Sequence, residues 1–309
     1  MRKRYVAPLT ACIALAVPAG ASAHASSPTV ALDYRLVLDD LAPSLHAVTV
    51  SVLDGDRALR VTVRGGRLIV RGDLGEPMLR IGPGGAFVNR ASITATAQRL
   101  THGGRGWSRV GGATFAWHDH RLAPPPYDGR HTGAVARFTI PATYDGRPAA
   151  LAGTFVRYRR PLLWPWLAGA GIAGPAVVLL LRLRPAVRAP LATLLGVLAG
   201  AGALTALVAF GVADAPNGRV AWVQIVLGSI LAAAVAGALV RLRGEHRTVL
   251  AGLLGAAAAV ASIGSLGVFR HGVVISLLPS TVSRFVCALA VTAGVAAAGT
   301  VFLMREQAP

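Results

Sequence analysis

The segment His46–Val70, HAVTVSVLDGDRALRVTVRGGRLIV, sets the fold class of the first half of the chain. Apolar and polar residues alternate on both sides of Asp54-Gly55, a pair that tolerates the positive φ of a tight hairpin. Alternation with a period of two is typical of a strand that buries one face. The same alternation comes just before this segment, at Val30, Leu32, Tyr34, Leu36 and Leu38.

Further strands follow along this half of the chain. The segment MLRIGPGGAFVN (78–89) predicts a hairpin around its glycines, and no helical stripe interrupts the pattern. Alternation also marks the segments 113–118, 134–140 and 150–158. Short strands separated by Gly- and Pro-rich turns predict an all-β sandwich of the immunoglobulin-like type over residues 24–160.

The N-terminus, MRKRYVAPLTACIALAVPAGASAHA, has the three parts of a secretory signal: a basic start, a short apolar run and a small-residue ending. The apolar run is too short to span a bilayer. Cleavage after Ala23 would remove residues 1–23 and leave His24 first, although Ala19-Gly20-Ala21 and Ala23-His24-Ala25 also fit the cleavage rule. The sequence thus predicts that the β domain is exported and extracytoplasmic.

Residues 161–309 form a second region, in which charged residues are rare. A transmembrane helix needs about 20 consecutive, mostly apolar residues. Five stretches reach this length, at about 162–181, 191–213, 220–240, 248–269 and 285–304. We therefore expect an all-α bundle of five transmembrane helices after the β domain.

The arginines between these stretches predict the orientation of the bundle, because cytoplasmic loops carry an excess of Lys and Arg. One set of connectors holds arginines at positions 182, 184, 188, 241, 243, 247 and 305. The opposite connectors hold Arg219, Arg270 and Arg284. This asymmetry predicts a multi-pass protein of the cell membrane with a cytoplasmic C-terminus, in agreement with an export signal.

Aromatic residues and arginines flank the first stretch, as is common at a membrane interface. The predicted aromatic anchors are Tyr158, Trp164 and Trp166, and the arginines expected at the lipid headgroups are Arg157, Arg159 and Arg160. Farther along, the segment 270–284 is apolar enough either to form an outer loop or to re-enter the bilayer.

Small residues inside the stretches favour close packing of helices. The sequence GAGIAG matches the dinucleotide-binding pattern G-x-G-x-x-G, but no strand precedes it and it lies within the first stretch. We therefore expect its glycines to permit helix contact, as in the G-x-x-x-G pair of the second stretch. These residues are Gly169, Gly171, Gly174, Gly196 and Gly200.

The stretch TFAWHDHRLAPPP (114–126) contains candidate metal ligands. On a strand, His118 and His120 would project from the same face about 6.5–7 Å apart, with Asp119 on the other face. Imidazole ligands suit copper or zinc. His24 at a mature N-terminus would add an amine and a further imidazole, which suits Cu(II).

The same stretch also has a structural interpretation without a metal. Trp117 would fill the core, while the polar residues after it leave the sandwich and enter the proline-rich turn. Asp119 would then pair with Arg121 or cap the turn, and the two histidines would be solvated. The sequence leaves both interpretations open.

Two segments carry a resemblance to a known group of proteins. GEPMLRIGPGGAFVNRAS (75–92), followed by WHDHR (117–121), is similar to a group of uncharacterised actinobacterial membrane proteins. The resemblance implies a signal peptide, an exported domain with a Gly-Glu-Pro-x-Leu-Arg hairpin and a Trp-His-Asp-His-Arg motif, and several C-terminal transmembrane helices. In that group a histidine and a tryptophan follow the arginine, whereas this chain has Leu122-Ala123-Pro124.

Composition and motifs exclude several classes of function. The formal charge is +18, but no basic run is interleaved with aromatic residues, so a nucleic-acid partner is not expected. The sequence lacks a nucleophile elbow, a phosphate loop and an H-E-x-x-H motif, which indicates a protein that is not an enzyme. The five stretches lack ionisable residues, which argues against a transporter.

We therefore expect the exported domain to act as a binding or assembly module, with the helices anchoring it in the lipid bilayer. Its expected partner is another envelope or membrane protein. The alternative is an extracytoplasmic copper or zinc binding module that uses the histidines of the WHDH stretch.

Overall fold

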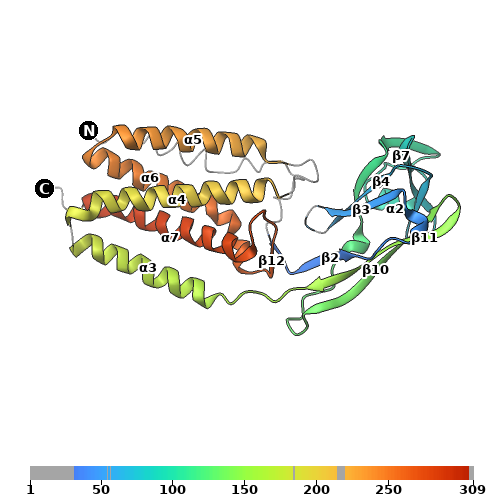
Figure 1. Ribbon diagram of the computed structural model, residues 1–309, viewed down its shortest axis with the longest axis horizontal. Coiled ribbons are helices and arrows are strands. Elements are labelled where there is room, and N and C mark those ends of the chain that lie inside the picture. Colours follow the sequence, from blue (N-terminus) through green and yellow to red (C-terminus); the bar gives the residue numbers. More distant parts are fainter. Residues whose placement is uncertain (1–30, 54, 56, 184, 214–219, 306–309) are drawn as a thin grey trace. The chain divides into compact units, whose positions relative to one another are not determined.

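The computed structural model describes residues 31–305, except residues 54, 56, 184 and 214–219. The predicted signal peptide and His24 lie outside the described residues. The chain divides into two compact units, one of Leu32–Arg159 and one that contains Arg160–Pro309 (Figure 1). The first unit is built from strands and the second from long helices.

The strands of the first unit form two antiparallel sheets. They are β2 (Tyr34–Leu38), β3 (Val48–Leu53), β4 (Ala58–Val63), β5 (Leu68–Arg71), β6 (Pro77–Gly82), β7 (Gly85–Asn89), β8 (Trp107–Gly111), β9 (Thr114–His118), β10 (Gly133–Tyr144) and β11 (Arg147–Arg157). A short β1 (Ala31–Leu32) precedes them and belongs to neither of these two sheets. Helical turns η2 (Pro43–Leu45), α2 (Ile93–Ala97) and η3 (His120–Leu122) lie between strands. The larger sheet has the order β2-β11-β10-β5-β6-β7-β8, and the smaller has the order β3-β4-β9.

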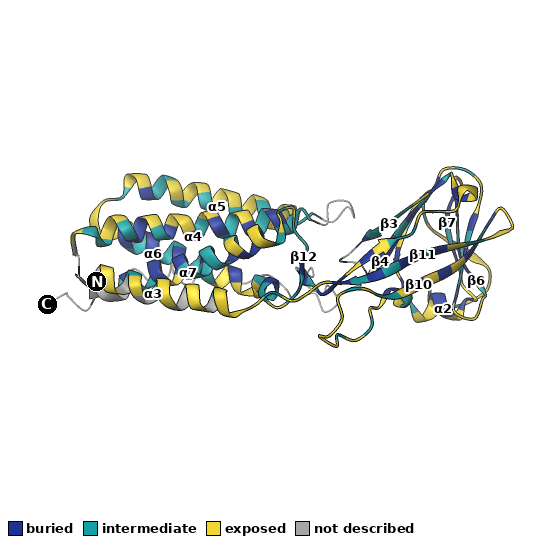
Figure 2. Cartoon of the chain, turned by 60° about the horizontal axis from the view of Figure 1, so that its bottom comes forward, coloured by how far each residue is buried: buried dark blue, intermediate teal, exposed yellow. Residues whose placement is uncertain are grey.

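The alternation in the sequence sorts residues between the core and the surface. Leu59, Val61 and Val63 of β4 are fully buried, as are Leu68 and Val70 of β5. Residues of both sheets belong to one hydrophobic core, and buried positions alternate with more exposed ones along the strands (Figure 2). Burying a Val or Leu side chain contributes about 1.5–3 kcal/mol, so slipping a strand by one residue would lose several such contributions at once.

The hairpin predicted from residues 78–89 is confirmed, because β6 pairs with β7 and Gly82 lies opposite Gly85. The strand distribution differs from the expected immunoglobulin-like arrangement, in which the constant-type sheets hold four and three strands. Here β10 has 12 residues and pairs with both β11 and β5, which joins most strands into one sheet. The chain passes to this sheet between β4 and β5, where Gly66 has a φ of +68°.

The second unit contains, within the described residues, the helices α3 (Trp164–Leu183), α4 (Arg188–Gly211), α5 (Trp222–Arg241), α6 (Gly244–Ser262) and α7 (Ser280–Arg305). The short elements η4 (Pro185–Val187), η6 (Ile263–Phe269) and β12 (Val273–Val274) lie between them. In the part of the chain that the structure describes, four segments are long and apolar enough to cross a membrane: Arg188–Gly211, Trp222–Arg241, Gly244–Phe269 and Ser280–Val301. The structure thus gives four candidate spans where the sequence predicted five. Helix α3 coincides with the first predicted stretch but is not among the four.

Helices α4, α6 and α7 pack against one another through small residues. A Cβ added at Gly196 of α4 would lie 2.4 Å from the carbonyl oxygen of Ala251 in α6. A Cβ added at Gly294 of α7 would lie 2.4 Å from the carbonyl oxygen of Gly255 in α6. Glycine is required at these points because the two backbones approach too closely for a side chain.

The other predicted packing glycines differ in their surroundings. A Cβ at Gly200 would lie 3.2 Å from Leu254, so this position also faces α6. Gly169, Gly171 and Gly174 lie in α3. A Cβ added at Gly169 or Gly174 would meet no described atom within 4 Å, so these two glycines make no close helix contact in the described part of the chain.

An ionisable side chain lies within a candidate span, which corrects the expectation from the sequence. The fifth predicted stretch begins after Arg284, but α7 begins at Ser280. Arg284 is 9% exposed and donates hydrogen bonds to the carbonyl oxygens of Val268, His271 and Gly272 at 2.8–3.0 Å. It thereby ties the segment between α6 and α7 to the start of α7.

Replacing Gly196 with alanine should destabilise the helical unit, because the added methyl group must displace the backbone of α6. Overpacking of this kind costs about 1–3 kcal/mol. We expect a lower thermal midpoint for the purified full-length protein in detergent, measured by fluorescence-detected size exclusion. Gly169→Ala is the matched control and should leave the midpoint unchanged or slightly raised. Equal losses in the two variants would contradict the packing described here.

Candidate functional site

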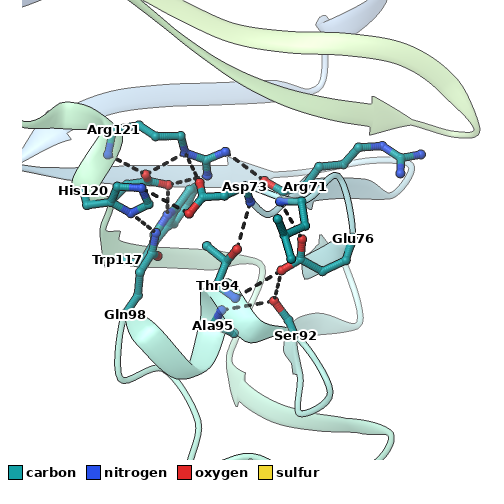
Figure 3. Close-up of polar contacts among 12 residues, drawn as sticks. Arg71, Asp73, Glu76, Ser92, Thr94, Ala95, Gln98, Trp117, His120 and Arg121 are labelled. Carbon is teal, nitrogen blue, oxygen red and sulfur yellow. Dashed lines mark hydrogen bonds and ion pairs between the residues drawn. The ribbon is translucent and has the colours of Figure 1, made fainter.

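The two motif segments, which are far apart in the sequence, converge in one polar cluster of the β unit (Figure 3). Asp119 follows β9 and begins η3. Asp73 and Glu76 lie in the turn between β5 and β6, and Ser92 precedes α2. The fold therefore brings GEPMLR, the end of the following hairpin and WHDHR together.

The carboxylate of Asp119 lies at the centre of this cluster and is 3% exposed. Trp117 is buried beside it and donates its indole N–H to Oδ2 at 3.1 Å. Arg121 donates Nε to Oδ1 at 2.8 Å and Nη2 to Oδ2 at 2.7 Å, and its backbone N–H also reaches Oδ1. Burial raises the pKa of Asp119, but the hydrogen bonds and charge of Arg121 outweigh it and hold this pKa below its ordinary value.

Arg121 also connects the motif to the neighbouring turn. Its Nη1 donates to the carbonyl oxygen of Arg71 at 3.0 Å, and its Nε lies 3.7 Å from Oδ1 of Asp73. The backbone N–H of Asp73 in turn donates to the hydroxyl of Thr94 in α2. One guanidinium thus links β9, the end of β5 and, through Asp73, the short helix.

Glu76 organises the other side of the cluster. Its Oε1 accepts hydrogen bonds from the hydroxyl of Ser92 at 2.8 Å and from the backbone N–H of Thr94 at 3.1 Å. Ser92 also caps α2 by accepting from the backbone N–H of Ala95. Partial burial raises the pKa of Glu76, but these hydrogen bonds lower it to about 2. Glu76 is therefore ionised and fixes the start of α2.

The two histidines of the motif lie on different elements. His118 is the exposed last residue of β9, whereas His120 lies in η3, because the turn that begins at Asp119 intervenes. They therefore do not project from one strand as predicted. Nε2 of His120 lies 3.1 Å from Oδ2 of Asp73, and its Nδ1 lies 3.2 Å from Nε2 of Gln98.

Asp119, which the sequence predicted as a metal ligand, already accepts hydrogen bonds from Trp117 and Arg121 at both of its carboxylate oxygens. Within residues 31–305, apart from the gaps given above, no group of three or more His, Cys, Asp or Glu side chains could hold a metal ion. His24 lies outside these residues. Copper or zinc binding by His24, His118 and His120 stays a prediction.

Arg157 differs from its expected position at the lipid headgroups. It is 4% exposed, forms an ion pair with Asp128, and donates Nη2 to the carbonyl oxygen of Pro126 at 3.1 Å. Its guanidinium also lies over the rings of Tyr34 and Tyr127, 5.2 and 5.4 Å from their centres. Arg157 therefore fastens the proline-rich segment to the sheet instead of reaching lipid.

The remaining predicted interface residues have more open surroundings. Tyr158 and Arg159 are exposed at the end of the β unit. Arg160 and Trp164, which precede and begin α3, are also exposed. Trp166 is half-buried and packs on Phe269, with ring centres 5.4 Å apart. The interface role of these residues stays a prediction.

The outward face of the larger sheet carries an arginine beside two aromatic rings. Arg80 of β6 lies directly opposite Phe87 of β7, so the two side chains share a face. Leu79 and Ile81 on either side of Arg80 are fully buried, which assigns Arg80 to the face away from the core. Its guanidinium lies 4.6 Å from the centre of Phe87 and 4.9 Å from that of Trp107 on the edge strand β8. We name these three residues the arginine–aromatic face.

This face does not stand out in the sequence, because its members come from three different strands. The available signals were weak: Arg80 occupies a polar position in an alternating strand, and Phe87 occupies the matching position of the next one. Trp107 lies in a Gly-rich segment that the sequence did not identify as a strand. No family model, curated protein or solved structure matches the chain.

Replacing Arg121 with alanine should destabilise the β unit strongly, because it leaves the buried Asp119 carboxylate without its cationic partner. Breaking a buried pair in this way costs about 3–5 kcal/mol. The urea unfolding of an isolated Leu32–Arg159 fragment, followed by circular dichroism, measures this loss. The double substitution His118→Ala/His120→Ala on the exposed side should cost less than about 1 kcal/mol. A mild effect of Arg121→Ala would contradict the central role of the pair.

The cluster also predicts an acid-sensitive β unit. Folding lowers the pKa of Glu76 from its ordinary value of 4.5 to about 2, so its ionisation stabilises the folded state above pH 4.5. This stabilisation is lost as the pH falls from 4.5 towards 2. We expect the urea midpoint of the fragment to fall over this range, and Glu76→Gln to flatten the dependence. Parallel pH curves for the two proteins would refute the role of Glu76.

Proposed function

We propose that this chain is an integral membrane protein whose β unit is an extracytoplasmic binding module anchored by the helices. Four candidate spans support the membrane location. Helix α3 has 20 residues, the length of a span, and we assign it as the first of five. With five spans the β unit and the C-terminus lie on opposite sides of the membrane. The excess of arginine in the connectors on the C-terminal side assigns the C-terminus to the cytoplasm.

The observation that carries the binding role is the arginine–aromatic face. Trp107 is 36% exposed although it is the largest side-chain type, and Phe87 beneath Arg80 is only half-buried. Trp, Tyr and Arg are the residues most enriched among those that dominate binding energy at protein interfaces. A guanidinium held against aromatic rings also loses less side-chain entropy when it binds a carboxylate than a free one does.

The chemistry of this face favours a protein partner that presents a carboxylate to Arg80 and an apolar side chain to Trp107. Strand β8 lies at the edge of its sheet, so a partner that docks there also meets unpaired backbone groups. The polar cluster around Asp119 supports a non-enzymatic role, because its charged groups are paired with one another. We infer an envelope or membrane protein as the partner.

Photo-crosslinking in living cells tests this function. A photoreactive amino acid at Val110, exposed on β8, should give an adduct of defined mass with the partner. Arg80→Ala and Trp107→Ala together should reduce this adduct at least tenfold, because each removes an anchor worth about 1 kcal/mol or more. The full-length protein must remain in the membrane at normal abundance.

Val37 provides the matched control, because it is exposed on β2 at the opposite edge of the same sheet. A photoreactive residue there should give no such adduct. Equal adducts from both edges, or an adduct at Val110 that survives the double substitution, would exclude the arginine–aromatic face as the binding surface.

A further inference from the structure

A groove of about 520 Å³ opens between the first half of α4 and the start of α6. Its lining has two chemically different sides. Pro190, Leu194 and Val197 of α4 form an apolar wall, and Arg243 and Arg247 lie on the side of α6. The groove belongs to the helical unit alone and is distinct from the arginine–aromatic face.

The apolar wall runs along α4. Pro190, Leu194 and Val197 are spaced at i, i+4 and i+7, so they lie on one face of the helix over about 10 Å. Leu194 is 54% exposed and Val197 is 45% exposed, so the described chain leaves this wall uncovered. Because α4 is a candidate span, the wall continues into the region that an acyl chain occupies.

The arginine side is electrostatically unfavourable in the protein alone. Arg243 and Arg247 are both exposed, and neither forms an ion pair within the described residues. They stand at the first turn of α6, the positive end of the helix dipole, where cations are disfavoured. Like charges spaced four residues apart also repel each other. A bound anion relieves all of these interactions.

We propose that this groove binds one anionic phospholipid. Its phosphate contacts Arg243 and Arg247, and an acyl chain lies along Leu194 and Val197. Basic pockets between transmembrane helices recognise anionic headgroups in this manner. The pairing of two guanidiniums with an apolar wall at the end of a candidate span favours a lipid over a soluble anion, which would leave the wall uncovered.

The excess of arginine in cytoplasmic loops explains why arginines lie between α5 and α6. It does not explain why two of them line the groove. Arg241, the last residue of α5, lies next to the same connector and is exposed, yet it does not line the groove. Arg241 therefore serves as a control. Replacing it distinguishes binding at a defined lipid site from general attraction between arginines and an acidic bilayer.

The test uses the full-length protein in a neutral detergent and native mass spectrometry. Dioleoyl phosphatidylglycerol and dioleoyl phosphatidylcholine are titrated in parallel, and the population with one retained lipid is measured. We expect the anionic lipid to be retained at concentrations about tenfold lower than the zwitterionic one. Arg243→Ala/Arg247→Ala should abolish this preference. Arg241→Ala/Arg270→Ala, which removes the same charge outside the groove, should keep it.

Two further experiments leave the arginines intact. They distinguish binding of a lipid from binding of a soluble anion. Val197→Trp fills the groove and should reduce retention of the anionic lipid about tenfold. Soluble glycerophosphoglycerol, which has the headgroup without acyl chains, should not displace the lipid. Equal retention of the two lipids, equal losses in the two double-arginine variants, or displacement by the soluble headgroup would each overturn the proposal.

Discussion

A carboxylate that cannot reach water must be paired inside the protein, and Asp119 imposes this requirement on the β unit. Trp117 and Arg121 satisfy both of its oxygens, which places one aromatic ring in the core and one guanidinium between two elements. That guanidinium then holds the carbonyl oxygen of Arg71. The turn that follows Arg71 presents Glu76 to α2. A single buried charge thus orders the region where both motif segments meet.

The helical unit depends on a different constraint, the distance between backbones. Where Gly196 meets Ala251 and Gly294 meets Gly255, the absence of side chains lets α4, α6 and α7 pack in direct contact. Beside this contact, the start of α6 leaves a groove next to the first half of α4. At the segment between α6 and α7, Arg284 satisfies backbone carbonyl groups instead of crossing the bundle.

Local patterns in the sequence predicted most of the strands, the hairpin around Gly82 and Gly85 and most of the apolar helices, because period and turn chemistry are properties of neighbouring residues. Strand order was not predictable, since β10 pairs with β5 across more than sixty residues of chain. Arg157 and Arg284 were misassigned for a related reason: their partners, Asp128 and the loop after α6, are identified only by the fold. The same holds for Arg80 and Trp107, whose contact joins separate strands.

The orientation of the chain in the membrane underlies the proposed function, and cysteine labelling in intact cells measures it most directly. In a chain with Cys12 and Cys287 replaced by serine, single cysteines are placed at His102, exposed in the β unit, or at His246, exposed at the start of α6. A membrane-impermeant maleimide should label His102→Cys in intact cells and His246→Cys only after permeabilisation. The reverse pattern, or labelling of both positions in intact cells, would contradict an extracytoplasmic binding module.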